Sequence, residues 1–213
     1  SSSQNNPANV IPIDPSVTNS FDAAREMWSD VANISWTPST SADVTFGFYT
    51  GVSGGLAYYP APIYDPLQSM GDIWLDPASN SASALGAGGY GFSLLLHEIG
   101  HAVGLQHTIP SPTLPAGTPV PTSPVNEDSV LYSTMTSTQG GYSGRFNVTP
   151  MMHDIVTVQR LYGANTSHNS TDTIYSFSDN SHPFDGITPE QYDDPGSVLM
   201  TLWDGGGFDS INA

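Results

Sequence analysis

The amino-acid sequence predicts one unit of mixed helices and strands, of the α+β or α/β class. Segments with apolar residues at three- and four-residue spacing are interspersed with short runs rich in Val, Phe, Tyr and Trp. The 213 residues show no internal repeat, and no apolar run reaches the roughly 18 residues that a membrane-spanning helix needs. These observations favour a single domain with a packed core.

The first helix is expected over residues 20–33, after an irregular polar lead over residues 1–19. Ser20 or Asn19 can cap its first turn, and Asp22 would lie near the positive end of the helix. Its apolar residues would share one face: Phe21, Ala24, Met27, Trp28 and Val31.

Three short strands are expected next, over residues 41–50, 55–60 and 71–77. They are rich in β-branched and aromatic residues, and Pro60 and Pro77 end the second and third. We expect the last of them, which contains GDIWLD, to be the edge strand that receives an extended peptide.

The second half of the chain predicts two more helices. After a small-residue loop (79–91), residues 92–103 are apolar on most faces and predict a buried helix. The Pro-rich residues 108–126 predict an ordered or lid-like loop. A third helix is expected over 149–162, with Pro150 in its first turn and Gly163 as its stop. Short strands are expected over 174–177 and 197–203.

Charge and composition exclude several classes of function. The chain has 3 basic and 20 acidic residues, a formal net charge of −17 at pH 7. So few cations cannot neutralise phosphates, which excludes nucleic-acid binding and a basic membrane-binding patch. The absence of Cys excludes disulfides, thiolate metal sites and cysteine nucleophiles. The polar first residues contain no signal-peptide core, so we expect a processed mature form or a fragment.

The sequence HEIGHAVGLQH, which begins at His97, carries the strongest chemical signal. His97 and His101 are four residues apart on the expected helix, so both imidazoles project from one face, as two ligands of one zinc ion require. Gly104 permits a sharp turn that returns His107 as a third nitrogen ligand. Three neutral nitrogens leave the ion an open position, which is the pattern of catalytic zinc. Beside them, the Glu98 carboxylate can accept a proton from zinc-bound water and pass it to a leaving amine.

The same stretch matches the extended zinc motif of the metzincin metalloproteases. The segment EDSVLYSTMTS (127–137) resembles the Met-containing turn of that family, with Met135 as its Met. Within the metzincins, the chain resembles the serralysins, secreted bacterial alkaline proteases, over about residues 20–210. Segments similar to serralysins occur in the same order: MWSDVANISW, VTFGFY, LAYYP, GDIWLD, MMHDIVTVQRLYGAN and LWDGGGFDS.

This resemblance implies an α+β metzincin catalytic domain over residues 20–203. It implies a twisted mixed β-sheet, an active-site helix and a second long helix. It also implies a cleft between an upper subdomain, to about residue 104, and a lower subdomain from residue 105. The implied activity is that of a secreted zinc-dependent endopeptidase, which hydrolyses peptide bonds through a metal-bound water with Glu98 as general base. The residues carried over are the zinc ligands His97, His101 and His107 and the structural residues Gly104 and Met135.

The chain departs from the serralysin pattern two residues after Met135. Serralysins carry there a Tyr that binds zinc in the resting enzyme and can stabilise the oxyanion, whereas this chain has Ser137. We therefore expect zinc to be held by three His and water. A donor to the oxyanion is expected to be missing, or to come from Tyr132, Tyr142 or the metal alone.

A calcium site is expected near the end of the chain. The pattern D-x-G-x-x-D provides carboxylates and carbonyls that suit a hard cation, at Asp204, Gly206 and Asp209. The resemblance supplies a partner loop after LYGAN, whose backbone carbonyls fall at Asn169, Thr171 and Thr173. Residues 204–213 would then be the truncated start of a calcium-binding β-roll. The alternative is a Gly-rich turn with solvated Asp.

Four weaker expectations complete the analysis. By family position, residues 137–143 would form a wall of the pocket for the side chain after the scissile bond. His153 is expected to be structural, whereas His168 and His182 are expected at the surface.

A second function stays open: a non-catalytic domain, stabilised by zinc and calcium, of a larger surface or secreted protein. Ser137 favours this alternative, whereas Glu98 favours the enzyme, because a scaffold has no use for that carboxylate. For the enzyme we expect protein or peptide substrates, no nucleic acid, no membrane insertion, a monomer and an extracellular location.

Overall fold

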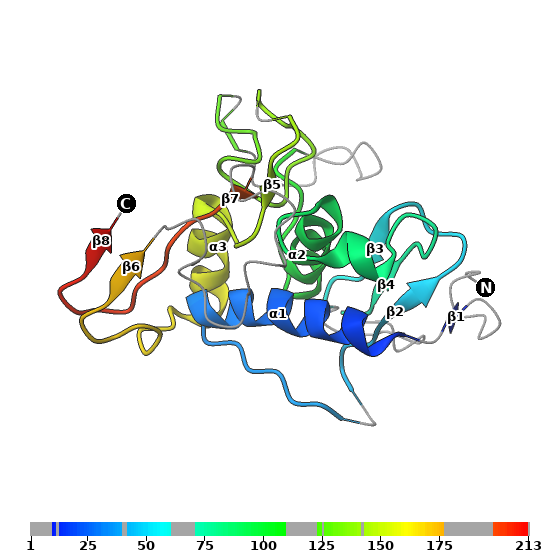
Figure 1. Cartoon of the computed structure of the whole chain (residues 1–213), viewed down its shortest axis with the longest axis horizontal. Helices are drawn as coiled ribbons and strands as arrows, with labels where there is room; N and C mark the ends of the chain where they lie inside the picture. The colour runs from blue at the N-terminus through cyan, green and yellow to red at the C-terminus, as the bar shows by residue number, and fades with distance from the viewer. Residues whose placement is uncertain are drawn as a thin grey trace.

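The computed structural model describes residues 10–11, 13–39, 42–60, 71–109, 123–124, 126–141, 143–176 and 198–212. Tyr142, His182 and most of the Pro-rich loop lie outside the described residues. Three α-helices and a mixed four-stranded sheet confirm the predicted mixture of helices and strands (Figure 1). None of the described helices has the length and apolar character needed to cross a lipid bilayer.

The first helix, α1, spans Pro15–Val31 and begins five residues before the predicted start. Asp14, not Ser20 or Asn19, is its N-cap, and its carboxylate accepts a hydrogen bond from the Ser16 backbone N–H at 2.9 Å. Pro15 fits the first helical turn because no helical acceptor is available there for a backbone N–H. The prediction of an irregular lead was wrong for the described residues, which also form strand β1 (Val10–Ile11).

The main sheet has the strand order β1-β2-β4-β3, with β2 at Phe46–Tyr49, β3 at Gly55–Ala57 and β4 at Ile73–Leu75. β1 and β2 are antiparallel, β2 and β4 are parallel, and β3 and β4 are antiparallel. The GDIWLD strand β4 therefore lies inside the sheet, and its prediction as an edge strand was wrong. The edge strand beside it is β3.

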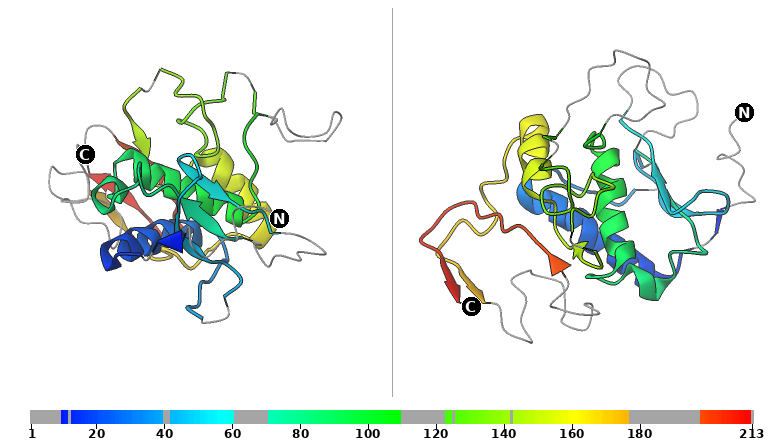
Figure 2. Two further views of the ribbon diagram at one scale, coloured as in Figure 1. Left: turned by 90° about the vertical axis from the view of Figure 1, so that its right-hand side faces the viewer. Right: turned by 90° about the horizontal axis from the view of Figure 1, so that it is seen from above.

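The central helix α2 spans Tyr90–Ala102, after a short 3₁₀ helix at Ala82–Leu85. It packs against both α1 and the sheet (Figure 2). The Trp28 side chain is completely buried, and its indole N–H donates to the Leu96 carbonyl at 3.3 Å. This bond joins α1 to the turn of α2 that carries the first histidine of the motif. The helix ends at Ala102, and Gly104, two residues later, turns the chain away with a φ of +101°.

The third helix, α3, spans Met152–Tyr162, so Pro150 precedes it rather than lying in its first turn. Gly163 follows with a φ of +84° and ends the helix as predicted. Two parallel strand pairs complete the described fold: β5 (Phe146–Asn147) with β7 (Val198–Leu199), and β6 (Ile174–Ser176) with β8 (Ser210–Asn212). The sequence did not predict β5 or β8.

One apolar cluster joins the three helices and the sheet. It contains side chains of α1, the sheet and α2, together with Met135 from the predicted Met turn and Val158 from α3. The core therefore holds α2 on several sides and fixes the positions from which its histidines project.

Candidate metal centre

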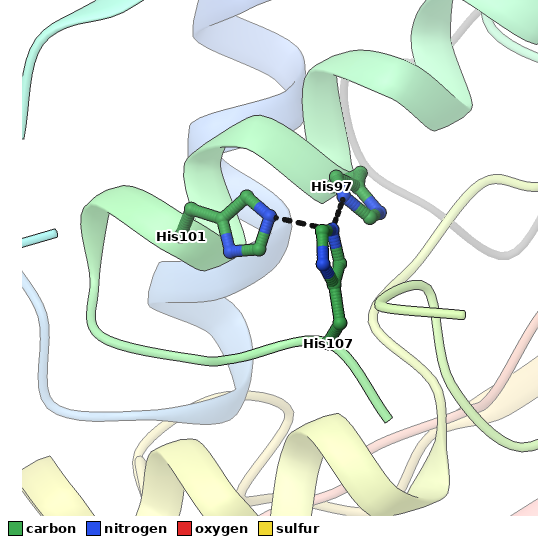
Figure 3. Close-up of side chains that lie close together, drawn as sticks. All are labelled: His97, His101 and His107. Carbon is green, nitrogen blue, oxygen red and sulfur yellow. Dashed lines mark hydrogen bonds between the residues drawn. The ribbon is translucent and has the colours of Figure 1, made fainter. Parts of the chain in front are cut away.

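The structure brings the three histidines of the motif together (Figure 3). α2 presents His97 and His101, and the chain after Gly104 returns His107 to face them. The Nε2 atom of His107 lies 3.1 Å from that of His97 and 3.1 Å from that of His101. One ligand atom from each of the three histidines lies within 4.8 Å of the others. Among the described residues, no other three His, Cys, Asp or Glu side chains meet in this way.

Backbone carbonyls orient two of the rings. The Nδ1 atom of His97 lies 2.8 Å from the Thr134 carbonyl oxygen, and that of His101 lies 2.8 Å from the Leu105 carbonyl oxygen. A carbonyl can only accept, so each Nδ1 carries the proton and each Nε2 keeps its lone pair for a ligand.

The geometry and protonation of the triad fit zinc. Tetrahedral zinc with Zn–N bonds of about 2.0–2.1 Å separates its nitrogen ligands by about 3.3 Å, close to the spacings found here. Burial lowers the pKa of His97 to about 4 and that of His101 to about 3, and it also lowers the pKa of His107. All three rings are therefore neutral near pH 7, which is the form that binds a metal.

Glu98 lies on the face of α2 that meets the edge strand β3. Its side chain is 4% exposed, and this burial raises the pKa of the carboxyl to about 8. A methyl group added to Gly55 of β3 would lie 2.5 Å from Glu98 Oε1, so a larger residue there would displace the carboxylate from its present position. Sequence reasoning missed Gly55, because its role depends on how the strand lies across the helix.

The aromatic side chain of Tyr59, which follows strand β3, borders the triad. The Tyr59 ring meets the His101 ring edge to face, with centroids 5.2 Å apart and an interplanar angle of 76°. Burial and the charge of Glu98 raise the pKa of the Tyr59 hydroxyl. The sequence analysis did not select Tyr59, although it lies in the LAYYP segment that resembles serralysins.

Met135 and its turn support the triad from the other side of α2. Its side chain is 1% exposed, and its sulfur lies 2.5 Å from the position that a methyl group on Gly100 would take. The turn also supplies the Thr134 carbonyl that orients His97. The predicted Met turn therefore packs directly against the helix that carries the motif.

Asp154 of α3 holds this turn in place. Its buried carboxylate accepts hydrogen bonds from the Ser133 hydroxyl at 2.6 Å, the Thr134 backbone N–H at 2.7 Å and the Met151 backbone N–H at 2.8 Å. Because Thr134 in turn orients His97, the carboxylate acts on the triad through one intervening residue. Sequence reasoning missed Asp154; an acidic residue between apolar positions of a helix is the available signal.

Asp128 joins the same turn to the segment that follows the third histidine. Its carboxylate accepts from the hydroxyls of Thr108 at 2.6 Å, Thr136 at 2.7 Å and Thr138 at 3.1 Å. Thr108 comes directly after His107, so these bonds tie the third imidazole to the Met135 turn. The sequence analysis also missed Asp128.

Three further residues from the sequence analysis lie outside the histidine triad: His153, His168 and Ser137. His153 lies 3.1 Å from Glu127 Oε2 and stacks on Tyr132, in keeping with a structural role. His168 is partly exposed, as a surface residue can be, and its Nδ1 atom lies 3.1 Å from Asp30 Oδ1. The Ser137 side chain is exposed.

A pocket of about 490 Å³ lies beside His107, between the chain after α2 and α3. Residues 137–141 and 143, expected in the wall of a substrate pocket, are not among its lining. The residues that line it include Gly104, His107, Ser133, Met135, His153 and Leu161.

The two segments expected to share calcium lie side by side through the pairing of β6 with β8. Asp209 Oδ1 accepts from the Thr173 backbone N–H at 3.0 Å, and Thr171 O accepts from the Thr173 hydroxyl at 2.8 Å. The Asp204 carboxylate accepts from the Tyr175 hydroxyl at 2.6 Å and from the Gly206 backbone N–H at 2.8 Å. Asn169 has a φ of +47° and donates to the Tyr175 hydroxyl oxygen at 3.1 Å.

The sequence of this chain is similar to those of several known metalloproteases. A serralysin of Photorhabdus sp. (strain Az29) is 32% identical over 200 residues, which are 88% of this chain and 40% of the relative. Metalloprotease AprA of Pseudomonas entomophila (strain L48) is 30% identical over 89% of this chain and 41% of the relative. Serralysin C of Dickeya chrysanthemi is 34% identical over 88% of this chain and 41% of the relative. The chain thus spans about two fifths of the length of these relatives. No protein-family model matches it.

Proposed function

This chain is a serralysin-like metzincin domain, and from that premise we propose that it is a zinc-dependent endopeptidase. The observation that carries the proposal is the convergence of three neutral imidazole nitrogens beside a buried carboxylate. Metalloproteases need both groups, because a metal alone does not move the protons that peptide-bond cleavage requires.

His97, His101 and His107 would hold the ion, and when bound, zinc supplies a Lewis acid for the scissile carbonyl and lowers the pKa of a coordinated water. Glu98 takes the proton from the attacking water and later gives it to the leaving nitrogen. Burial strengthens this base, because it raises the pKa of the carboxyl to about 8, so the ionised carboxylate takes the water proton more readily than an exposed carboxylate would.

The edge strand β3 would bind the substrate. Its pairing with β4 leaves the backbone groups of its other side for an extended peptide. The peptide would then lie across Glu98, because Gly55 of the same strand packs against that side chain. The sheet and α2 would form the upper wall of the cleft, and the Met135 turn and α3 the lower wall.

Calcium is the second ion that we propose. Support comes from the adjacency of the two predicted segments, with ligands from the carbonyls of Asn169, Thr171 and Thr173 and from Asp204, Gly206 and Asp209. Such an ion would tie β6 to β8 in a chain that has no Cys for disulfides. We further propose an extracellular location, protein or peptide substrates and a monomeric state.

The decisive experiment combines metal analysis with hydrolysis of casein by the intact chain and by Glu98→Gln. We expect one zinc in each protein, and a loss of at least about 10³-fold in hydrolysis by the variant, within the usual range for a general base. The exposed Glu26→Gln is the matched control and should keep full activity.

Two results would contradict the proposal. Equal hydrolysis by Glu98→Gln would remove Glu98 from its role. Bound zinc without hydrolysis of casein or of a broad peptide library would instead favour a non-catalytic, metal-stabilised domain of a larger protein.

A further inference from the structure

The edge strand β3 and the residues that continue it follow α2 along the metal centre. Gly55 packs against Glu98, as described above. Four residues further on, the Tyr59 ring contacts His101. A methyl group on Gly104 would lie 3.8 Å from Pro60 Cγ, so the strand segment reaches the end of the helix. Alternate residues of an extended chain face the same side, so Tyr59 faces α2 as Gly55 does.

The backbone immediately before Tyr59 is fixed. The Tyr58 backbone N–H donates to the Asp72 carbonyl at 3.0 Å, and its carbonyl accepts from the Gly71 backbone N–H at 3.1 Å. These bonds extend the β3–β4 ladder by one residue and leave Tyr59 directly after it. The ring position beside His101 therefore follows from strand pairing.

The Tyr59 hydroxyl is free to meet a ligand. The residue is 46% exposed, and its hydroxyl donates no hydrogen bond to any residue that the structure describes. A donor with no partner, located between the peptide-binding strand and the metal centre, matches a group that binds substrate oxygen.

We propose that Tyr59 is a further catalytic residue, whose neutral phenol donates a hydrogen bond to the oxygen of the scissile carbonyl as that oxygen becomes an oxyanion. This inference rests on the proposed peptidase function. As the water oxygen bonds to the carbonyl carbon, the π pair of the carbonyl moves to its oxygen, where the phenol donates. Glu98 takes the water proton and passes it to the nitrogen as the C–N bond breaks, and Tyr59 keeps its own proton throughout.

Other described tyrosines have different partners. Tyr132 stacks on His153, and Tyr90 meets Phe146 edge to face. The Tyr162 hydroxyl donates to the Val103 carbonyl, and that of Tyr175 donates to Asp204. Tyr59 is the tyrosine of the described chain whose ring contacts the histidine triad.

The test compares Tyr59→Phe with Tyr90→Phe, a matched control on an exposed tyrosine at the start of α2. We expect kcat of the Tyr59 variant to fall roughly 10- to 100-fold with KM nearly unchanged. This is less than the ~10²–10³-fold effect of a fully enclosed oxyanion donor, because Tyr59 is half exposed. Zinc affinity, measured by competition with a chelator, should not change in either variant.

A second readout does not depend on turnover. A phosphinic peptide carries a tetrahedral anionic oxygen, whereas the same peptide with a reduced CH₂–NH bond lacks that oxygen. Tyr59→Phe should bind the phosphinic peptide roughly 10-fold or more weakly and the reduced peptide with unchanged affinity.

Wild-type kcat and phosphinic affinity in Tyr59→Phe would overturn the inference. Equal loss of affinity for both peptides, or loss of zinc, would also overturn it and assign Tyr59 a structural role. If the intact chain hydrolyses no peptide, the proposed function fails, and the phosphinic comparison still decides whether Tyr59 contacts the oxygen.

Discussion

At the scale of single residues, the proposed metal centre depends on groups other than the three imidazoles. The Thr134 and Leu105 carbonyls fix the tautomer of two imidazoles, and burial keeps those imidazoles neutral. The identity of the ligands therefore accounts for only part of the site. The backbone around them determines which nitrogen is available.

Asp154→Asn tests this dependence. The amide keeps the volume, but its NH2 group replaces one of the two acceptor oxygens, so at least one buried donor among Ser133, Thr134 and Met151 loses its acceptor. We expect a loss of about 2–3 kcal/mol in the free energy of unfolding. Because Thr134 then holds His97 less firmly, zinc affinity should fall roughly 10-fold or more. Denaturant unfolding and chelator competition measure the two effects.

The exposed Asp22→Asn is the control for that experiment and should change neither quantity. An Asp154 variant that unfolds more easily but binds zinc as tightly as the parent would show that Asp154 does not affect the orientation of His97 through the Thr134 turn.

The sequence predicted the residues of the triad and missed those that support it, for a physical reason. His97, His101 and His107 lie within one helix and one turn, so their spacing alone implies convergence. Asp154, Asp128 and Tyr59 reach the site from distant segments. Their roles depend on tertiary packing, which no local spacing encodes.

At the scale of elements, the edge strand β3 packs against the helix α2. Gly55 of β3 faces Glu98 of α2, and its missing side chain leaves the space that Glu98 occupies.

Gly55→Ala should therefore impair catalysis more than folding. The added methyl would collide with the Glu98 carboxylate, which can move because it ends a flexible side chain. We expect hydrolysis to fall at least about 10-fold, by displacement of the general base, while the free energy of unfolding changes by less than about 1 kcal/mol. Steady-state kinetics and urea unfolding would measure these effects.

Gly141→Ala gives a comparison, since a methyl there meets no atom within 4 Å, although its φ of +87° adds strain. Unchanged hydrolysis by Gly55→Ala would contradict the contact between β3 and the general base.

Predictions about elements succeeded where a local signal sufficed. The three main helices and the strands β2, β3 and β4 were expected near their places, and Gly163 ended α3 as predicted. The start of α1 was wrong because Asp14 and Pro15, an N-cap followed by a favourable first-turn residue, were assigned to the irregular lead. The prediction that β4 is the edge strand was wrong because strand order depends on the pairing between β2, β3 and β4, which the strand sequences alone do not specify.

At the scale of the whole molecule, the C-terminal residues are joined to the body through β6 and β8 and through Tyr175. The Tyr175 residue is 5% exposed, and burial together with the hydrogen bond to Asp204 raises the pKa of its hydroxyl to about 12.

This shift predicts a specific loss of stability in alkali. The unfolded chain releases the Tyr175 proton near pH 10, whereas the folded chain keeps it to about pH 12. The contribution of Tyr175 to the free energy of unfolding, up to about 2 kcal/mol, is therefore complete below pH 10 and is lost as the pH rises through 12. Tyr175→Phe should unfold more easily at neutral pH and show a flatter decline between pH 10 and 12 in urea titrations.

The exposed Tyr162→Phe, which removes a hydroxyl that donates to the Val103 carbonyl, is the control for loss of a tyrosine hydroxyl. A Tyr175 variant with the same slope as the parent would assign the alkaline transition to other groups.

Removal of zinc should also act on the whole molecule. At free zinc about 1,000 times its Kd, binding adds about 4 kcal/mol to the stability of the folded chain, which a chelator removes. We expect the thermal midpoint to fall by roughly 10 °C, as a chain of this size loses a few degrees per kcal/mol. Calorimetry with and without chelator would measure it, and an unchanged midpoint would contradict zinc binding by the folded protein.

The paired carbonyls behind the imidazoles have a further consequence for how the protein becomes loaded. These carbonyls hold the rings of His97 and His101 independently of any ion, so a cation that binds there would require little rearrangement of the chain. Uptake should then be limited by how fast the ion sheds its hydration water.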